Sequence, residues 1–128
     1  MKIVYNSIIP VQGFIAINLF GTLFVRKEYA YKLQIPRYKE KILNHESIHT
    51  EQMKDFACFL PLCLQQYIGG IIFYIIYFFE WLWRVLFTKD RFSHKAYRNI
   101  SFEQEAYKNE TNLFYLDTRN HFEQWKIY

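Results

Sequence analysis

Residues 44–56 read NHESIHTEQMKDF, and this stretch decides how the rest of the chain must fold. On a helix, His45 and His49 lie one turn apart on the same face, so both imidazoles can bind one zinc ion at roughly 2.0 to 2.1 Å. Glu46 flanks the pair, and its carboxylate can take a proton from the zinc-bound water and pass it to a leaving amine. The stretch predicts a catalytic zinc site, unless HESIH is a chance string on a solvated helix.

The chain before this helix predicts a small N-terminal antiparallel sheet. Three runs of β-branched and aromatic residues alternate with Pro and Gly, which mark turns. These runs are Lys2–Tyr5, Phe14–Leu19 and Thr22–Arg26. Pro36 suits the first turn of a helix, and helix-compatible sequence continues from there to Gln66, with a kink expected near Pro61.

A third metal ligand must come from later in the chain, because no histidine follows His49 at the HExxHxxGxxH spacing. A capping box at residues 101–104 predicts a last helix from Phe102 to about Thr118. Glu103 falls within an apolar stripe of this helix, where a carboxylate is costly without a partner. Zinc would be that partner, so Glu103 is the predicted third ligand; pairing with Arg98 is the alternative.

Further polar residues near Glu103 are candidates for supporting roles. Glu110 is the next candidate ligand or an acceptor for a histidine ring nitrogen, whereas Glu105 is expected on the opposite, polar face. Peptide hydrolysis also needs a donor that stabilises the oxyanion. The candidates are His94, Tyr97, Arg98 and Tyr107, with a packing or surface role as the alternative for each.

Together, NHESIH and the later SFEQEAYKNE resemble the gluzincin family of zinc metallopeptidases, and the chain also resembles short bacterial HExxH proteins. The family's glutamate helix often reads E-x-x-A-D. The resemblance implies that Glu103 binds zinc and that Ala106 permits close helix packing. Tyr107 stands where aspartate is usual, so it could steady a ligand histidine only through its hydroxyl. The implied function is hydrolysis of a peptide or protein substrate; an inactive zinc-binding scaffold is the alternative.

Residues 56–87 form an apolar, aromatic segment that limits the topology. A single membrane crossing here would separate the two histidines from the glutamate. We therefore expect a helical hairpin that turns at Gln65–Gly70 and is re-entrant or interfacial, because each arm is shorter than the roughly 20 residues of a span. Glu80 and Arg84 are expected to pair at i, i+4 spacing.

Aromatic residues followed by basic ones suggest contact with membrane lipid, with the active site on the cytoplasmic side. The residues concerned are Tyr74, Tyr77, Trp81, Trp83, Lys89, Arg91, Lys95 and Arg98. The alternative is a soluble cytoplasmic protein with an aromatic core. A further alternative is a membrane-interaction protein that binds no metal.

The length and composition fit one zincin-like domain, residues 1–128, of the α+β class and mainly helical. The 16 basic and 12 acidic residues are interleaved and give a net charge of +4, so no basic stripe points to nucleic acid. Cys58 and Cys63 are expected to be buried thiols. The sequence predicts no particular oligomeric state.

Overall fold

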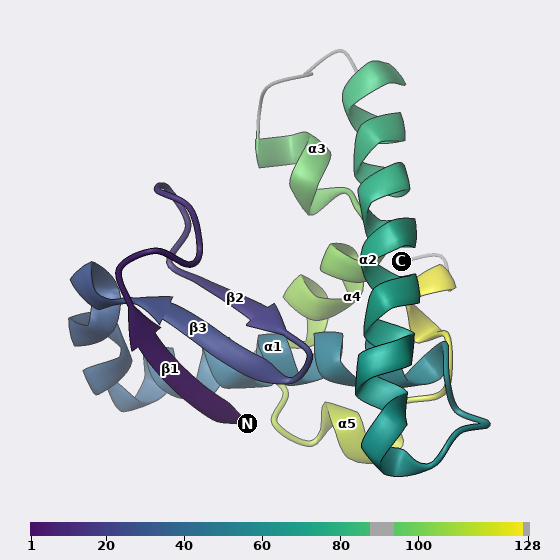
Figure 1. Cartoon of the computed structure of the whole chain (residues 1–128), viewed down its shortest axis with the longest axis horizontal. Helices are drawn as coiled ribbons and strands as arrows, with labels where there is room; N and C mark the ends of the chain where they lie inside the picture. The colour runs from purple at the N-terminus through teal and green to yellow at the C-terminus, as the bar shows by residue number, and fades with distance from the viewer. Residues whose placement is uncertain (88–93, 127–128) are drawn as a thin grey trace.

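The computed structural model describes residues 1–87 and 94–126 of the chain. In Figure 1 the small sheet lies at the left, the helix of residues 36–55 passes behind it, and the longest helix, residues 62–87, stands upright at the right. The α+β, mainly helical fold expected from the sequence is confirmed.

The three predicted strands are present, but the prediction of an antiparallel sheet is wrong in part. The strands are β1 (Lys2–Asn6), β2 (Ala16–Leu19) and β3 (Thr22–Arg26), in the order β1-β3-β2. β2 and β3 form an antiparallel hairpin, whereas β1 runs parallel to β3. β2 occupies one edge of β3 and β1 pairs along the other, and the sheet is mixed because the two pairings run in opposite senses.

The hairpin turn consists of Phe20 and Gly21, both with positive φ, of 51° and 79°. Two left-handed residues give a turn whose twist matches that of the strands, although phenylalanine adopts this conformation at a cost. The Phe20 ring packs against Tyr67 and Tyr74 of the long helix, with centroids 5.9 and 5.6 Å apart. These contacts dock the hairpin on that helix.

The helical part contains two long helices and several short ones. They are η1 (Lys27–Gln34), α1 (Pro36–Asp55), α2 (Leu62–Phe87), α3 (His94–Arg98), α4 (Ser101–Asn109), α5 (Tyr115–Thr118) and η2 (Glu123–Trp125). Pro36 opens α1 as predicted. The predicted last helix is too long, because α4 ends at Asn109 and the chain turns before α5.

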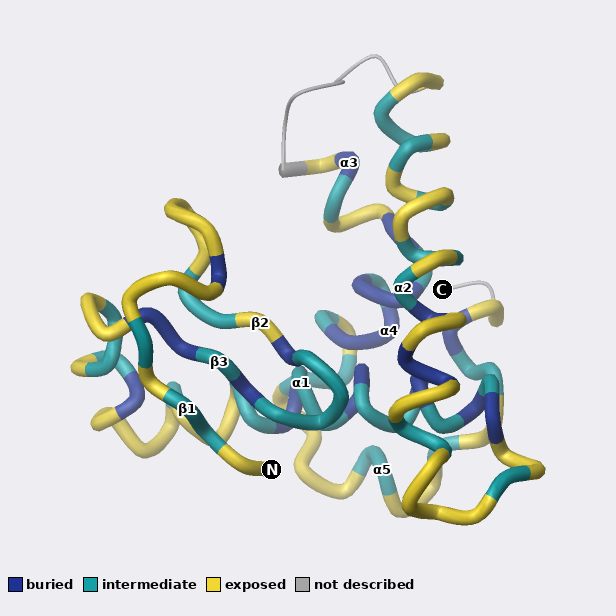
Figure 2. Tube along the Cα trace, viewed as in Figure 1, coloured by how far each residue is buried: buried dark blue, intermediate teal, exposed yellow. Residues whose placement is uncertain are grey.

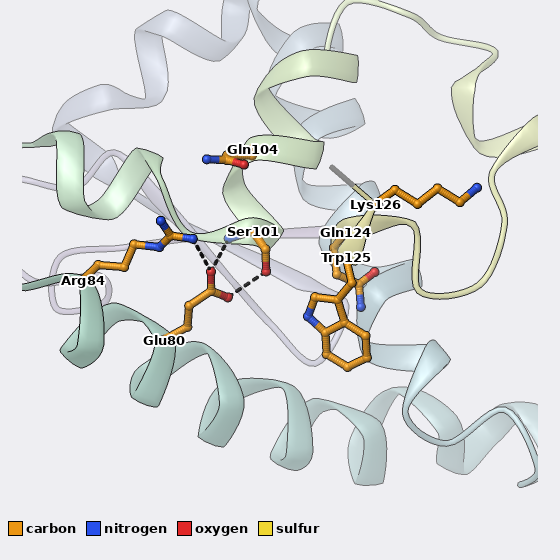
Figure 3. A pocket seen from close by; sticks show the side chains of 7 residues that line it. All are labelled: Glu80, Arg84, Ser101, Gln104, Gln124, Trp125 and Lys126. Atoms are coloured by element: carbon orange, nitrogen blue, oxygen red, sulfur yellow. Dashed lines mark hydrogen bonds and ion pairs between the residues drawn. The ribbon is translucent and has the colours of Figure 1, made fainter. Parts of the chain in front are cut away.

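The predicted capping box is also wrong. The N–H and hydroxyl groups of Ser101 donate instead to the two carboxylate oxygens of Glu80, each over 2.7 Å. Arg84 donates to the same carboxylate over 3.1 Å, so the expected Glu80–Arg84 pair forms (Figure 3). These bonds fasten α4 to α2 at the edge of a shallow polar pocket that also contains Trp125.

The predicted hairpin at residues 65–70 is wrong, because α2 runs unbroken through this stretch. The chain turns earlier, after α1 ends at Asp55, and Pro61 immediately precedes α2. Gly69 lies where α2 crosses α1: a Cβ there would lie 1.9 Å from the carbonyl oxygen of Met53. Gly69 therefore permits close packing of α2 on α1, and Gly70 leaves room for the Phe20 ring, so neither glycine ends the helix.

One side of α2 packs on the other helices, and its opposite side is exposed and apolar (Figure 2). Within the described residues, α2 alone is long and apolar enough to cross a membrane, by length and composition only, and 17% of its apolar window is buried. Cys58 and Cys63 are exposed, so the expectation of buried thiols is wrong. Lys89 and Arg91 lie outside the described residues.

Candidate metal centre

His45 and His49 of α1 and Glu103 of α4 converge on one point. The two Nε2 atoms lie 3.2 Å apart. Glu103 Oε1 lies 3.3 Å from Nε2 of His49, and Oε2 lies 3.5 Å from Nε2 of His45. All three side chains are buried, and one ligand atom from each lies within 4.8 Å of the others. The group can hold a metal ion.

The residue before His45 holds the two ligand-bearing helices together. The side-chain nitrogen of Asn44 lies within 3.1 Å of three carbonyl oxygens at the end of α4, those of Asn109, Glu110 and Asn112. The Asn109 and Asn112 carbonyls also accept backbone N–H groups of the turn that follows α4, so Asn44 fastens this turn to α1. Ala106 is fully buried, as its predicted role in close packing requires.

A second group orients each imidazole. Nδ1 of His45 lies 3.0 Å from Glu110 Oε2, which matches the predicted acceptor role of Glu110. Nδ1 of His49 lies 2.7 Å from Gln52 Oε1, and the Gln52 amide donates in turn to Glu105 and to the Phe102 carbonyl. With Nδ1 donating, the Nε2 lone pair of each ring faces the centre.

Without a metal, His49 and Glu103 stabilise each other's charged forms. Burial disfavours the charged form of His49, but Glu103 and Glu46 outweigh burial and raise the pKa of this imidazole from 6.5 to about 9. Burial opposes ionisation of Glu103 as well, yet the two histidines hold its pKa well below the usual range. The buried Oε2 of Glu103 has no hydrogen-bond donor among the described residues. A cation at the centre would provide that oxygen with a partner.

Glu46 faces a cavity of about 590 Å³ that reaches the same centre. His49 and Glu103 line this cavity too, so the group that could hold a metal ion is open on one side. Burial raises the pKa of the half-buried Glu46 carboxyl, and the positive charge of His49 and His45 partly offsets this rise. A carboxyl with a raised pKa suits a proton acceptor at neutral pH.

The candidate oxyanion donors differ in placement. Tyr97 lines the cavity, and burial together with the charge of Glu103 raises its pKa, so its hydroxyl keeps its proton. Tyr107 packs edge-on against His45, with ring centroids 4.7 Å apart, beneath the guanidinium of Arg98. Tyr107 therefore supports His45 through its ring, and Arg98 does not pair with Glu103. The side chain of His94 lies outside the described residues.

The prediction that Glu105 lies on a polar face is wrong. Its side chain is fully buried and forms an ion pair with Arg119, which also binds Asp55. Tyr115 donates a further bond to Glu105 over 3.0 Å. Arg119 and Tyr115 lie more than one helical turn after Glu105 in the sequence. The helical periodicity of α4 contains no sign of them, and it therefore predicted an exposed side chain.

Sequence patterns also left three supporting residues undetected. Tyr77 donates from its hydroxyl to Glu103 Oε1 over 2.8 Å, and Asn18 donates to the backbone carbonyl of Glu46 over 2.7 Å. Both contacts join segments far apart in the chain. The third residue, Gln52, lies three residues after His49 on the same helix, and this spacing could have revealed it.

Comparisons with known proteins add no family to this geometry. No protein-family model, curated protein or solved structure matches the chain. The functional conclusion therefore depends on the side chains around His45, His49 and Glu103.

Proposed function

We propose that the chain is a zinc-dependent metallopeptidase of the gluzincin type. Two histidines and a glutamate are the protein ligands of catalytic zinc in several peptidases. A tetrahedral ion with bonds of about 2.0 to 2.1 Å holds its ligand atoms roughly 3.4 Å apart. The distances of 3.2, 3.3 and 3.5 Å among the ligand atoms of His45, His49 and Glu103 support this assignment.

The observation that carries the proposal is the cavity that reaches Glu46 and the metal-binding group together. Structural zinc sites are closed by four protein ligands, whereas catalytic sites keep one position open for water and substrate. Here three side chains converge and the remaining side is open. This favours a peptidase over the inactive scaffold in which zinc merely links α1 to α4.

Each residue of the site would have a separate role in peptide hydrolysis. Bound zinc would polarise the scissile carbonyl and activate water as a nucleophile. Glu46 accepts the proton that the attacking water loses and delivers it to the amine nitrogen as the carbon–nitrogen bond breaks. The protonated hydroxyl of Tyr97 is placed at the cavity to donate to the oxyanion. His45, His49 and Glu103 would hold the ion.

The free edge of β2 supports a peptide as the substrate. The Arg26 N–H donates to the Ile15 carbonyl over 3.1 Å, which fixes the alternation of the hairpin ladder. By that alternation, the main-chain groups of Ala16 and Asn18 point away from β3. The Tyr74 hydroxyl donates to the Asn18 carbonyl over 2.6 Å. Among the described residues, the main-chain groups of Ala16 and the Asn18 N–H remain to pair with an extended chain.

We further propose that the protein associates with membranes through the exposed side of α2. Large apolar side chains on this side, among them Ile71, Ile75, Phe79 and Trp83, are between 53% and 64% exposed. Lipid would cover this surface without separating the metal ligands, because α3 and α4 return the chain to α1. Flotation with lipid vesicles tests this part: the protein should rise with the vesicles, and protein that stays in solution without detergent would contradict it.

Replacing Glu46 tests the peptidase function directly. Glu46→Gln should abolish peptide hydrolysis while zinc remains bound, because the amide cannot accept the proton. Glu40→Gln is the matched control, since Glu40 is an exposed glutamate on the same helix. Equal turnover in the two variants would remove Glu46 from the mechanism, and no turnover in a zinc-loaded wild type on any peptide would favour the scaffold.

A further inference from the structure

The cavity beside the metal-binding group has one polar end and a long apolar remainder. Glu46, His49 and Glu103 form the polar end, next to Asn18. Most of the other lining side chains are aliphatic or aromatic, and they come from the loop between β1 and β2 and from α2. The chief ones are Ile8, Val11, Phe14, Phe73, Phe78 and Trp81.

The loop between β1 and β2, residues 7–15, is anchored at its base. The side-chain oxygen of Asn6 accepts bonds from the N–H groups of Ile8 and Ile9, over 2.8 and 2.6 Å. Arg26 donates to the Pro10 carbonyl over 2.8 Å. The loop nevertheless leaves Ile8 81% exposed, so an anchored backbone presents an apolar side chain to the outside.

The opposite wall of the cavity is apolar at its surface as well. Phe78 of α2 is 53% exposed and Trp81 is 37% exposed, and both line the cavity. A ligand that enters between the loop and α2 therefore removes apolar surface from water on both sides. A polar side chain seated against these two walls would lose hydration and gain no hydrogen bonds from their apolar side chains.

The polar features of the cavity distinguish between apolar ligands. Ala16 and Asn18 line it and direct main-chain hydrogen-bonding groups away from β3, as the hairpin register shows. An acyl chain cannot use those groups, whereas an extended polypeptide can. The cavity thus combines main-chain recognition with apolar walls.

We infer that this cavity binds an apolar segment of a polypeptide, with bulky aliphatic or aromatic side chains seated between residues 7–15 and α2, beside the bond to be cleaved. This inference rests on the proposed peptidase function. It specifies the substrate class as a hydrophobic stretch of polypeptide, of the kind found in membrane proteins.

Binding can be tested without turnover. Zinc-loaded Glu46→Gln protein in neutral detergent is mixed with a Lys-flanked peptide that has a Leu and Ala centre and one photoreactive phenylalanine. Adducts on residues 7–15, Phe78 or Trp81 are expected after illumination. Adducts confined to the far side of α2 would overturn the inference. A photoreactive phosphatidylcholine tests a lipid as the occupant, and labelling of the cavity by this lipid that the peptide does not displace would also overturn the inference.

Two exposed phenylalanines provide a kinetic test. Phe78 of α2 lines the cavity, whereas Phe114, which precedes α5, is not among its lining residues. Phe78→Ser should lower kcat/KM for the apolar peptide about tenfold, the loss expected for one buried aromatic contact, and Phe114→Ser should not. Equal kcat/KM in both variants, with hydrolysis intact, would refute the apolar pocket but leave the peptidase function standing.

Discussion

The side-chain oxygen Oε1 of Gln52 lies 2.7 Å from Nδ1 of His49, three residues earlier on α1. Gln52 is fully buried, and its amide nitrogen donates to Glu105 Oε2 over 2.9 Å. The rotation of the His49 ring is therefore tied to the buried ion pair between Glu105 and Arg119. A candidate metal ligand is thus oriented by a network whose other members, Glu105 and Arg119, lie outside the group that could hold the ion.

Loss of Gln52 should weaken metal binding while all three ligands remain. We expect Gln52→Ala to lower zinc affinity by about 10- to 100-fold, the usual cost of removing a group that orients a ligand histidine. Competition with a chromophoric chelator, well below the unfolding temperature, measures the affinity. Gln104→Ala on α4 is the control, and an unchanged affinity in Gln52→Ala would mean that the ring needs no such support.

The metal-free protein should lose stability as the solution becomes alkaline. The pKa of His49 rises from 6.5 to about 9 on folding, so this imidazole stabilises the fold fully below pH 6.5. That contribution disappears as the pH rises through about 9. Thermal unfolding in the presence of a chelator should show the decline between these pH values, and His49→Gln should show a smaller one. Identical pH profiles for the two proteins would contradict the assignment.

The two glycines of α2 should respond differently to alanine. A Cβ on Gly69 would meet the backbone oxygen of Met53 at 1.9 Å, whereas a Cβ on Gly70 would meet the Phe20 ring at 2.7 Å. Backbone cannot move aside as a side chain can. We expect Gly69→Ala to destabilise the protein by about 3 kcal/mol or more and Gly70→Ala by less, as measured by denaturant unfolding. The reverse order would argue against the close crossing of α1 and α2.

The sequence was sufficient for features that depend on local pattern. Runs of β-branched residues located the strands, and Pro36 located the start of α1. Helical spacing placed His45 and His49 on one face. The carboxylate in an apolar stripe identified Glu103, because a buried charge requires a partner.

Features that depend on distant partners could not be predicted in this way. The sequence pattern of β1 is the same whether it pairs with β2 or β3, so the parallel pairing stayed hidden. Gly69 and Gly70 read as a break because the groups that they accommodate, the Met53 carbonyl oxygen and the Phe20 ring, belong to other elements of the fold. Glu105 read as exposed because Arg119, its partner, lies in a later segment.

The most direct test of the metal centre is the zinc content of the purified protein. Elemental analysis should find about one zinc per chain in the wild type and almost none in His49→Ala or Glu103→Ala. Glu40→Gln should keep the wild-type content. Zinc lost from His49→Ala but retained in Glu103→Ala would mean that a residue other than Glu103 is the third ligand. The absence of zinc from the wild type would contradict the account.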